Sequence, residues 1–161
     1  MAVAQSAFFK GKEMGLMAEY FATMADVYRL TGELNEIHDQ TETADGAEKT
    51  LSASAIRLSR MTGYEYSADE LSVWQQFAQT IKNQQKYKIT KACERQLSRC
   101  DVYEGISFIG AGVGRFLVKQ IADELGYNYV DFTDLINNNL TDIGMDVADC
   151  APAVAVDMLV E

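Results

Sequence analysis

The stretch GISFIGAGVGRFLVKQIADELGYNYVDF, residues 105–132, carries the most informative pattern in this chain. A strand-like run at 106–109 leads into glycines at alternate positions, which are Gly110, Gly112 and Gly114. An amphipathic run then ends at Gly126, and a second strand-like run covers 127–132. In this order of strand, glycine turn, helix and strand, a backbone approaches a phosphate closely while the helix N-terminus faces the anion. The stretch therefore predicts contact with a nucleotide or an organic diphosphate.

The spacing of the turn residues leaves more than one interpretation open. The candidate phosphate-binding residues are Gly110, Ala111, Gly112, Gly114 and Arg115. A dinucleotide fingerprint has glycine where Arg115 stands, but Asp131 lies 21 residues after Gly110, where an acid would bind a ribose. A Rossmann-like module for a dinucleotide or S-adenosylmethionine is therefore one alternative, and a packing turn without a ligand is another. Arg115 would strengthen an anion site, or would form a salt bridge with Asp131 or Glu104.

Composition and charge exclude several classes of partner. The 161 residues are 48% hydrophobic, which is enough to bury the core of one domain. Of the net charge of −10, most falls in residues 101–161, which hold 2 basic and 11 acidic side chains. This is the wrong sign for a nucleic-acid-binding face. No apolar run approaches the length of a membrane span, and the N-terminus lacks the order of a signal peptide.

Cysteine and histidine usage indicates a reducing compartment and no histidine-based metal centre. Cys93, Cys100 and Cys150 form no CxxC pair and are odd in number, as is typical of reduced thiols in the cytoplasm. His38 is the only histidine. We therefore expect a cytoplasmic protein without direct metal ligands.

Helical spacing dominates the first hundred residues. Apolar residues recur at three- and four-residue steps over 13–30, and Gly32 stands where a C-terminal cap belongs. A second helix is predicted at 51–61. Residues 68–99 read as one long helix or as two with a break near 86–88.

Local signals mark the start of two helices and the need for more strands. Ser67 and Glu70 have the spacing of a capping box, and Pro152 fits the first turn of a helix that begins near Asp149. Two strands do not make a stable sheet alone, because each leaves an unpaired edge. Residues 3–9 are the candidate for a further strand. We therefore expect a homo-oligomer, or a need for a further segment or partner subunit.

Four motifs give the chain a resemblance to a known family. The motifs are MAEYFATMADVYRLTGEL (17–34), DQTETADG (39–46), FIGAGVGRFL (108–117) and DCAPAVAV (149–156). With these motifs the chain resembles the hydantoinase/oxoprolinase-like proteins of the tetrahydromethanopterin-linked one-carbon transfer pathway.

The resemblance implies an α/β fold, specifically part of an actin-like ATPase lobe of ribonuclease-H-like type with a helix-rich insertion. A mainly helical segment, 1–100, and a phosphate-binding segment, 101–161, would together form one domain within a larger protein. Family members carry an upstream half with two further phosphate loops, which this sequence lacks. The implied partner is that N-terminal half, or a subunit that supplies it.

The resemblance also implies a reaction. Relatives take part in methanofuran synthesis, where an amine- or phenol-bearing acceptor condenses with a diphosphate-activated partner and diphosphate leaves. ATP or an organic diphosphate with Mg²⁺ would then occupy the glycine turn. The alternative from another class is a non-catalytic subunit that docks through the basic face at 82–99.

Asp26, Arg29 and Asp45 are weaker site candidates. Asp26 would hold a metal-bound water or a substrate amine, and Arg29 a diphosphate, for which a guanidinium fork is well shaped. The plain alternative for these two is an exposed ion pair three residues apart on a helix. Asp45 with Gly46 is a turn signal, and a role near a ligand is a hypothesis.

Overall fold

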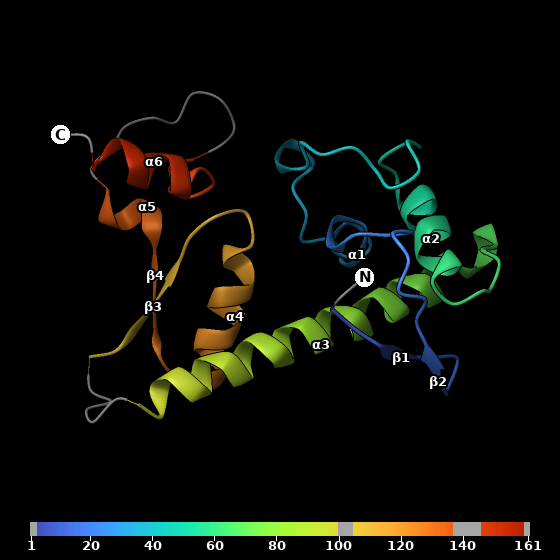
Figure 1. Cartoon of the computed structure of the whole chain (residues 1–161), viewed down its shortest axis with the longest axis horizontal. Helices are drawn as coiled ribbons and strands as arrows, with labels where there is room; N and C mark the ends of the chain where they lie inside the picture. Colours follow the sequence, from blue (N-terminus) through green and yellow to red (C-terminus); the bar gives the residue numbers. More distant parts are fainter. Residues whose placement is uncertain (1–2, 100–104, 137–145, 160–161) are drawn as a thin grey trace. The chain divides into compact units, whose positions relative to one another are not determined.

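The computed structural model describes residues 3–99, 105–136 and 146–159. The chain forms two compact units, unit 1 at Met1–Ile89 and unit 2 at Thr90–Glu161 (Figure 1). The division falls within a long helix, eleven residues before the division near 100 suggested by the sequence. In the described part of the chain, no helix is long and apolar enough to cross a membrane.

Unit 1 begins with a β-hairpin. Strand β1 (Ser6–Phe9) pairs antiparallel with β2 (Lys12–Gly15). The connecting residues Lys10 and Gly11 both have positive φ, 47° and 78°, which suits the twist of a two-residue hairpin turn. The prediction that 3–9 contains a strand is confirmed. Its expected pairing with the glycine-turn strands is wrong, because β1 pairs with β2.

The first helix is shorter than predicted. Helix α1 spans Met24–Thr31 and ends at Gly32, whose left-handed φ of 81° confirms the predicted cap. The predicted start at residue 13 is wrong, because β2 and a loop occupy residues 12–23. Phe21 of this region packs against the core without helical structure, whereas Met17 and Tyr20, which completed the three- and four-residue spacing, are exposed.

The remaining helices of unit 1 follow the predicted pattern with two corrections. After the short 3₁₀ turn η1 (Glu36–His38), α2 spans Leu51–Arg60, within one residue of the prediction. The 3₁₀ turn η2 (Ala68–Glu70) leads into α3 (Leu71–Leu97). The predicted capping box is wrong, because the Ser67 hydroxyl donates to Asp69 instead. A break at 86–88 is also wrong: α3 is continuous there, as a stretch without glycine or proline allows.

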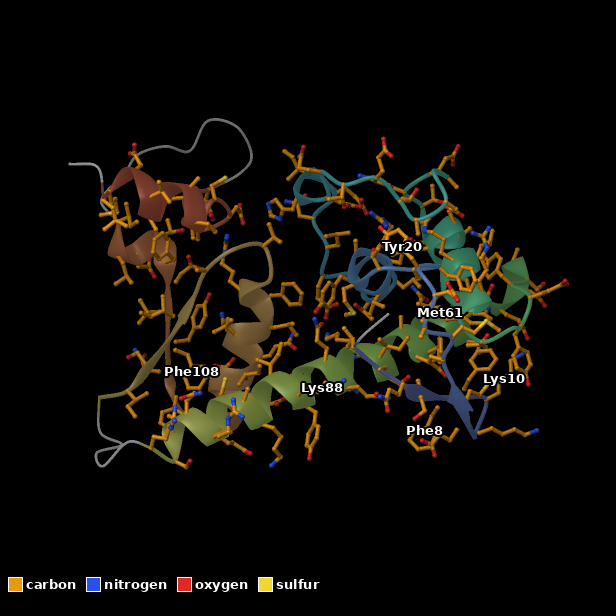
Figure 2. All side chains as sticks on the ribbon, viewed as in Figure 1. Phe8, Lys10, Tyr20, Met61, Lys88 and Phe108 are labelled. Atoms are coloured by element: carbon orange, nitrogen blue, oxygen red, sulfur yellow. The ribbon has the colours of Figure 1, made fainter. Side chains whose placement is uncertain are left out.

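The core of unit 1 gathers around one aromatic cluster. Trp74 and Phe77 lie on the buried face of α3, and Phe9 of β1 packs against both, with ring centroids 4.6 and 5.3 Å away. Phe8, the preceding residue, projects away from this cluster and is 64% exposed (Figure 2). The alternation of a strand thus buries one phenylalanine and exposes its neighbour.

Unit 2 contains the predicted strand, glycine turn, helix and strand. These are β3 (Ser107–Gly110), α4 (Arg115–Leu125) and β4 (Asn128–Asp131), with Gly126 left-handed after α4. The strands are parallel, as required when a helix connects them, and Gly110 pairs with Asp131. Two short helices follow, α5 (Phe132–Leu135) and α6 (Ala151–Asp157), the latter with Pro152 in its first turn as predicted.

Candidate functional site

The three turn glycines differ in the reason that each position requires a glycine. A Cβ on Gly110 would lie 2.2 Å from the Tyr129 hydroxyl, so packing excludes a side chain there. Gly112 has φ +77°, which side chains disfavour. Gly114 has an ordinary φ of −90° and open space around it. Only Gly114 is therefore unexplained by the chain's own turn and packing.

The backbone of the turn already has internal partners. The Gly112 N–H donates to the Ala148 carbonyl at 2.6 Å, and the Arg115 N–H donates to the Gly112 carbonyl at 3.1 Å. The first of these bonds ties the turn to the segment that precedes α6. A phosphate at this turn would therefore have to use other N–H groups, or displace Ala148.

The guanidinium of Arg115 contacts three carboxylates. Its Nε lies 3.1 Å from Asp131, and its terminal nitrogens lie 2.5 Å from Asp146 and from Asp149. Burial lowers the pKa of Arg115, but these charges outweigh it and the pKa lies above its ordinary value. The salt bridge to Asp131, which was the alternative to an anion-binding role for Arg115, is confirmed, whereas Glu104 lies outside the described residues.

Asp131 also accepts hydrogen bonds that stabilise the local structure. Its side chain caps α5 by accepting from the Thr133 N–H at 3.0 Å, and it accepts from the Tyr129 hydroxyl at 3.1 Å. Burial raises its pKa, but these hydrogen bonds and Arg115 hold the pKa below the usual range. Asp131 is thus ionised at the carboxyl end of β4, beside the turn.

A second cluster of charges lies in unit 1, and it is buried. Asp26 is 2% exposed and accepts from the Ser54 hydroxyl at 2.9 Å and from Arg57 Nε at 2.8 Å. It also accepts from the N–H of Thr23, the N-cap of α1, at 3.0 Å, as the third helical residue of a capping box does. The plain alternative of an exposed pair with Arg29 is therefore wrong: both side chains are buried, and the Asp26–Arg29 distance is 3.6 Å.

Arg29 bridges α1 to the loop that follows it. Its guanidinium binds Glu36 at 2.7 and 2.8 Å and Asp39 at 2.5 Å. Burial raises the pKa of Asp39, but Arg29 and Lys49 outweigh it and the pKa lies below the ordinary value. Asp39 is therefore a fixed anion at one end of the loop.

The other end of the loop is held by α2. Asp45 accepts from Arg57 at 3.2 Å and from Arg60 at 2.8 Å, and Arg57 also binds the Glu48 carbonyl at 3.3 Å. Sequence reasoning missed Arg57, which is completely buried. The available signal was its position between Ala55 and Leu58 on the apolar side of a short helix.

The structure thus groups the predicted residues into two sets. The turn residues and Arg115 lie together in unit 2, and Asp26, Arg29 and Asp45 share the charge network of unit 1 through Arg57. Among residues 3–99, 105–136 and 146–159, no three acidic, histidine or cysteine side chains form a group that could hold a metal ion.

These features define a mixed α/β protein with a glycine turn at the carboxyl end of a parallel strand pair. The hydantoinase/oxoprolinase family model matches residues 10–154, which is most of the chain. The chain therefore belongs to the hydantoinase/oxoprolinase family. No curated protein matches it.

Proposed function

We propose that this chain contributes the nucleotide- or diphosphate-binding part of a cytoplasmic transferase in tetrahydromethanopterin- and methanofuran-linked one-carbon metabolism. The reaction is the condensation of an amine- or phenol-bearing acceptor with a diphosphate-activated partner, with release of diphosphate. Unit 2 would belong to an actin-like lobe. Membership of the hydantoinase/oxoprolinase family supports an enzymatic role.

One observation carries the proposal. Gly110 and Asp131 end adjacent parallel strands in register, and α4 starts at Arg115 directly after the turn. Ligands of α/β proteins bind at the carboxyl ends of parallel strands, where helix N-termini face them. The open space at Gly114 leaves room for a ligand atom close to the backbone.

The three aspartates around Arg115 define how a diphosphate would enter. One guanidinium among three carboxylates leaves an excess of negative charge, which repels a bare anion. Mg²⁺ prefers oxygen ligands and keeps several waters, so a magnesium diphosphate would offer its metal waters to the carboxylates. Arg115 would then exchange a carboxylate for phosphate oxygens, which its fork also fits.

Calorimetric titration of the full chain with ATP, with inorganic diphosphate, with NAD and with S-adenosylmethionine tests the assignment, each with and without Mg²⁺. ATP or diphosphate should bind, and only with the metal. Binding of NAD or S-adenosylmethionine in their place would favour the Rossmann-like alternative. Absence of binding by all four would leave the turn a packing element and remove the proposal.

Two variants locate the ligand. Gly114→Val fills the open space without forcing a left-handed φ and should abolish binding; Gly112→Val is unsuitable, because it would strain the turn itself. Arg115→Gln should weaken binding and, in the reassembled enzyme, lower the rate about 10²- to 10³-fold, as for loss of one charge-stabilising donor. Lys119→Gln removes an equal charge one turn along α4 from an exposed site and should leave binding unchanged.

The proposal includes a partner that completes the sheet. Over the residues described, the β3–β4 sheet has two strands, and Ile109 of β3 is 52% exposed. An added strand, from a second copy or from an N-terminal half, would cover this edge. The basic face at 82–99 is a weaker docking candidate, because Lys82 is buried and ion-paired with Glu33. Light scattering that gives a monomer at high concentration, with no strand-supplying partner in a native extract, would contradict this.

A further inference from the structure

Unit 1 contains a pocket that plays no part in the proposed transferase site. Its volume is about 340 Å³, and residues 40–43, 46, 47 and 49 line it. It therefore lies entirely within the loop that connects η1 to α2. Pockets of this size suit small organic ligands.

The loop around the pocket is fixed by buried charges instead of apolar packing. No side chain of the described loop 39–49 belongs to the hydrophobic core. Arg29 holds the loop at Asp39, and Arg57 holds it at Asp45 and at the Glu48 carbonyl. Burial of these charged side chains costs on the order of several kcal/mol per ion in desolvation, which their ion pairs offset. The result is a polar pocket whose walls are held in place before any ligand arrives.

Two opposite charges line the pocket. The Lys49 side chain is 34% exposed, and its ammonium donates to the Asp39 carbonyl and lies 3.6 Å from the Asp39 carboxylate, which together fix its position. Glu42 also lines the pocket, and within the described residues no hydrogen bond or ion pair engages its carboxylate. The neighbours Gly46 and Ala47 are small, so the space beside these charges is open.

We propose that this pocket binds a small ammonium carboxylate, a molecule of amino-acid type with one amine and one carboxylate. Lys49 pairs with the ligand carboxylate, and Glu42 pairs with its ammonium group. Thr41 and Thr43 supply hydroxyl oxygens that accept further hydrogen bonds, because their own protons go to Asp39 and to the Ala47 carbonyl. Diphosphates are poor ligands here, because the negative charge of Glu42, beside Lys49 as the one cation among the lining residues, repels them.

Backbone amide chemical shifts of the isotope-labelled full chain test the proposal. The probes are glycine, β-alanine and γ-aminobutyrate, which separate the two charges by increasing lengths, with acetate and methylammonium as single-charge controls. At least one zwitterion should shift the amides of residues 40–49 saturably. Each single-charge control should bind at least about tenfold more weakly, since one ion pair of order 1.4 kcal/mol is lost.

Charge-neutralising variants then separate binding from folding. Glu42→Gln removes a group without a partner in the described chain, so it leaves the loop in place and should weaken the zwitterion about tenfold. Lys49→Gln should do the same, and Lys12→Gln on the exposed face of β2 should change nothing. If no zwitterion shifts these amides, if acetate binds as well, or if Glu42→Gln binds like the unaltered chain, the proposal is overturned. None of these outcomes depends on the glycine turn, so the two proposals fail separately.

Discussion

The guanidinium of Arg57 lies 2.7 Å from the carboxylate of Asp26, and the two side chains are 0% and 2% exposed. They join α2 to α1 inside unit 1, where neither charge reaches water. Such a pair adds little net stability over apolar packing, but removal of one partner takes away the compensation for the buried charge of the other. The pair therefore determines which faces of α1 and α2 pack together, and it contributes less to the strength of that packing.

Replacement of Arg57 by Met should lower the free energy of unfolding by about 3–5 kcal/mol, because buried Asp26 loses its nearest cation and keeps only Arg29, 3.6 Å away. Urea denaturation followed by Trp74 fluorescence measures this. Arg60→Met is the matched control: Arg60 also binds Asp45 but is 43% exposed, so the loss should stay below about 1 kcal/mol. Equal losses for the two variants would show that the Asp26–Arg57 pair is not desolvated in solution.

Phe9→Ala should destabilise unit 1 by about 3–5 kcal/mol, since it opens a cavity against Trp74 and Phe77. Phe8→Ala, one residue earlier in β1, should change the free energy of unfolding by no more than about 0.5 kcal/mol. Trp74 is the only tryptophan, so its emission reports both variants directly. A larger effect at Phe8 would mean that the strand register is shifted by one residue.

Gly110→Ala should cost about 1–3 kcal/mol, because its Cβ meets the ring and hydroxyl of Tyr129. Gly114→Ala meets no atom within 4 Å and should cost less than about 1 kcal/mol, the size of an N-cap change. Thermal unfolding compares them. Combined with Tyr129→Ser, the Gly110 change should become nearly harmless; strict additivity in that double variant would rule out the contact.

Two tyrosine phenols should ionise at a higher pH than an ordinary tyrosine. Burial raises the pKa of Tyr28 to about 12, with the charge of Glu33 acting in the same direction. Burial, followed by the hydrogen bond to Asp131, raises the pKa of Tyr129 to about 12. Unfolded tyrosine has a pKa of 10.0. The contribution of these two tyrosines to the free energy of unfolding should therefore be constant below pH 10 and change as the pH rises from 10 to about 12, where the folded protein loses stability.

Phenolate absorbance during a pH titration checks the two tyrosines. Tyr28→Phe and Tyr129→Phe should each remove one step near pH 12 and leave the steps at lower pH unchanged. Loss of a step near pH 10 in either variant would show that the phenol is hydrated in the folded protein.

The sequence predicted unit 2 better than unit 1, and the reason is the range of the interactions. The glycine turn, the cap at Gly126 and the parallel strands depend on neighbours within about 25 residues, so the pattern contains them. The helix expected over 13–30 failed because loop residues also bury apolar side chains. Spacing alone does not distinguish a loop that folds over a core from a helix that lies on it.

The two candidate sites were predictable to different degrees. Gly110 to Arg115 were located together, whereas the three aspartates around Arg115 were not foreseen as a set. Two of them, Asp146 and Asp149, come from a segment more than 30 residues away. Arg57 was missed because an arginine in a helix is usually solvated, and burial becomes favourable only with Asp26, 31 residues away.

The anchoring of loop 39–49 by arginines from two different helices has a consequence for the order of folding. Asp39 needs Arg29 of α1 and Asp45 needs Arg57 of α2, so the loop gains its contacts only after these helices have paired. Its interactions should therefore be absent at the rate-limiting barrier, and changes within it should alter the unfolding rate and spare the folding rate. Stopped-flow measurements on Asp45→Ala test this, and a slowed folding limb would contradict it. A ligand bound in the pocket would then lower the unfolding rate and leave the folding rate unchanged, so it would lengthen the lifetime of the native chain.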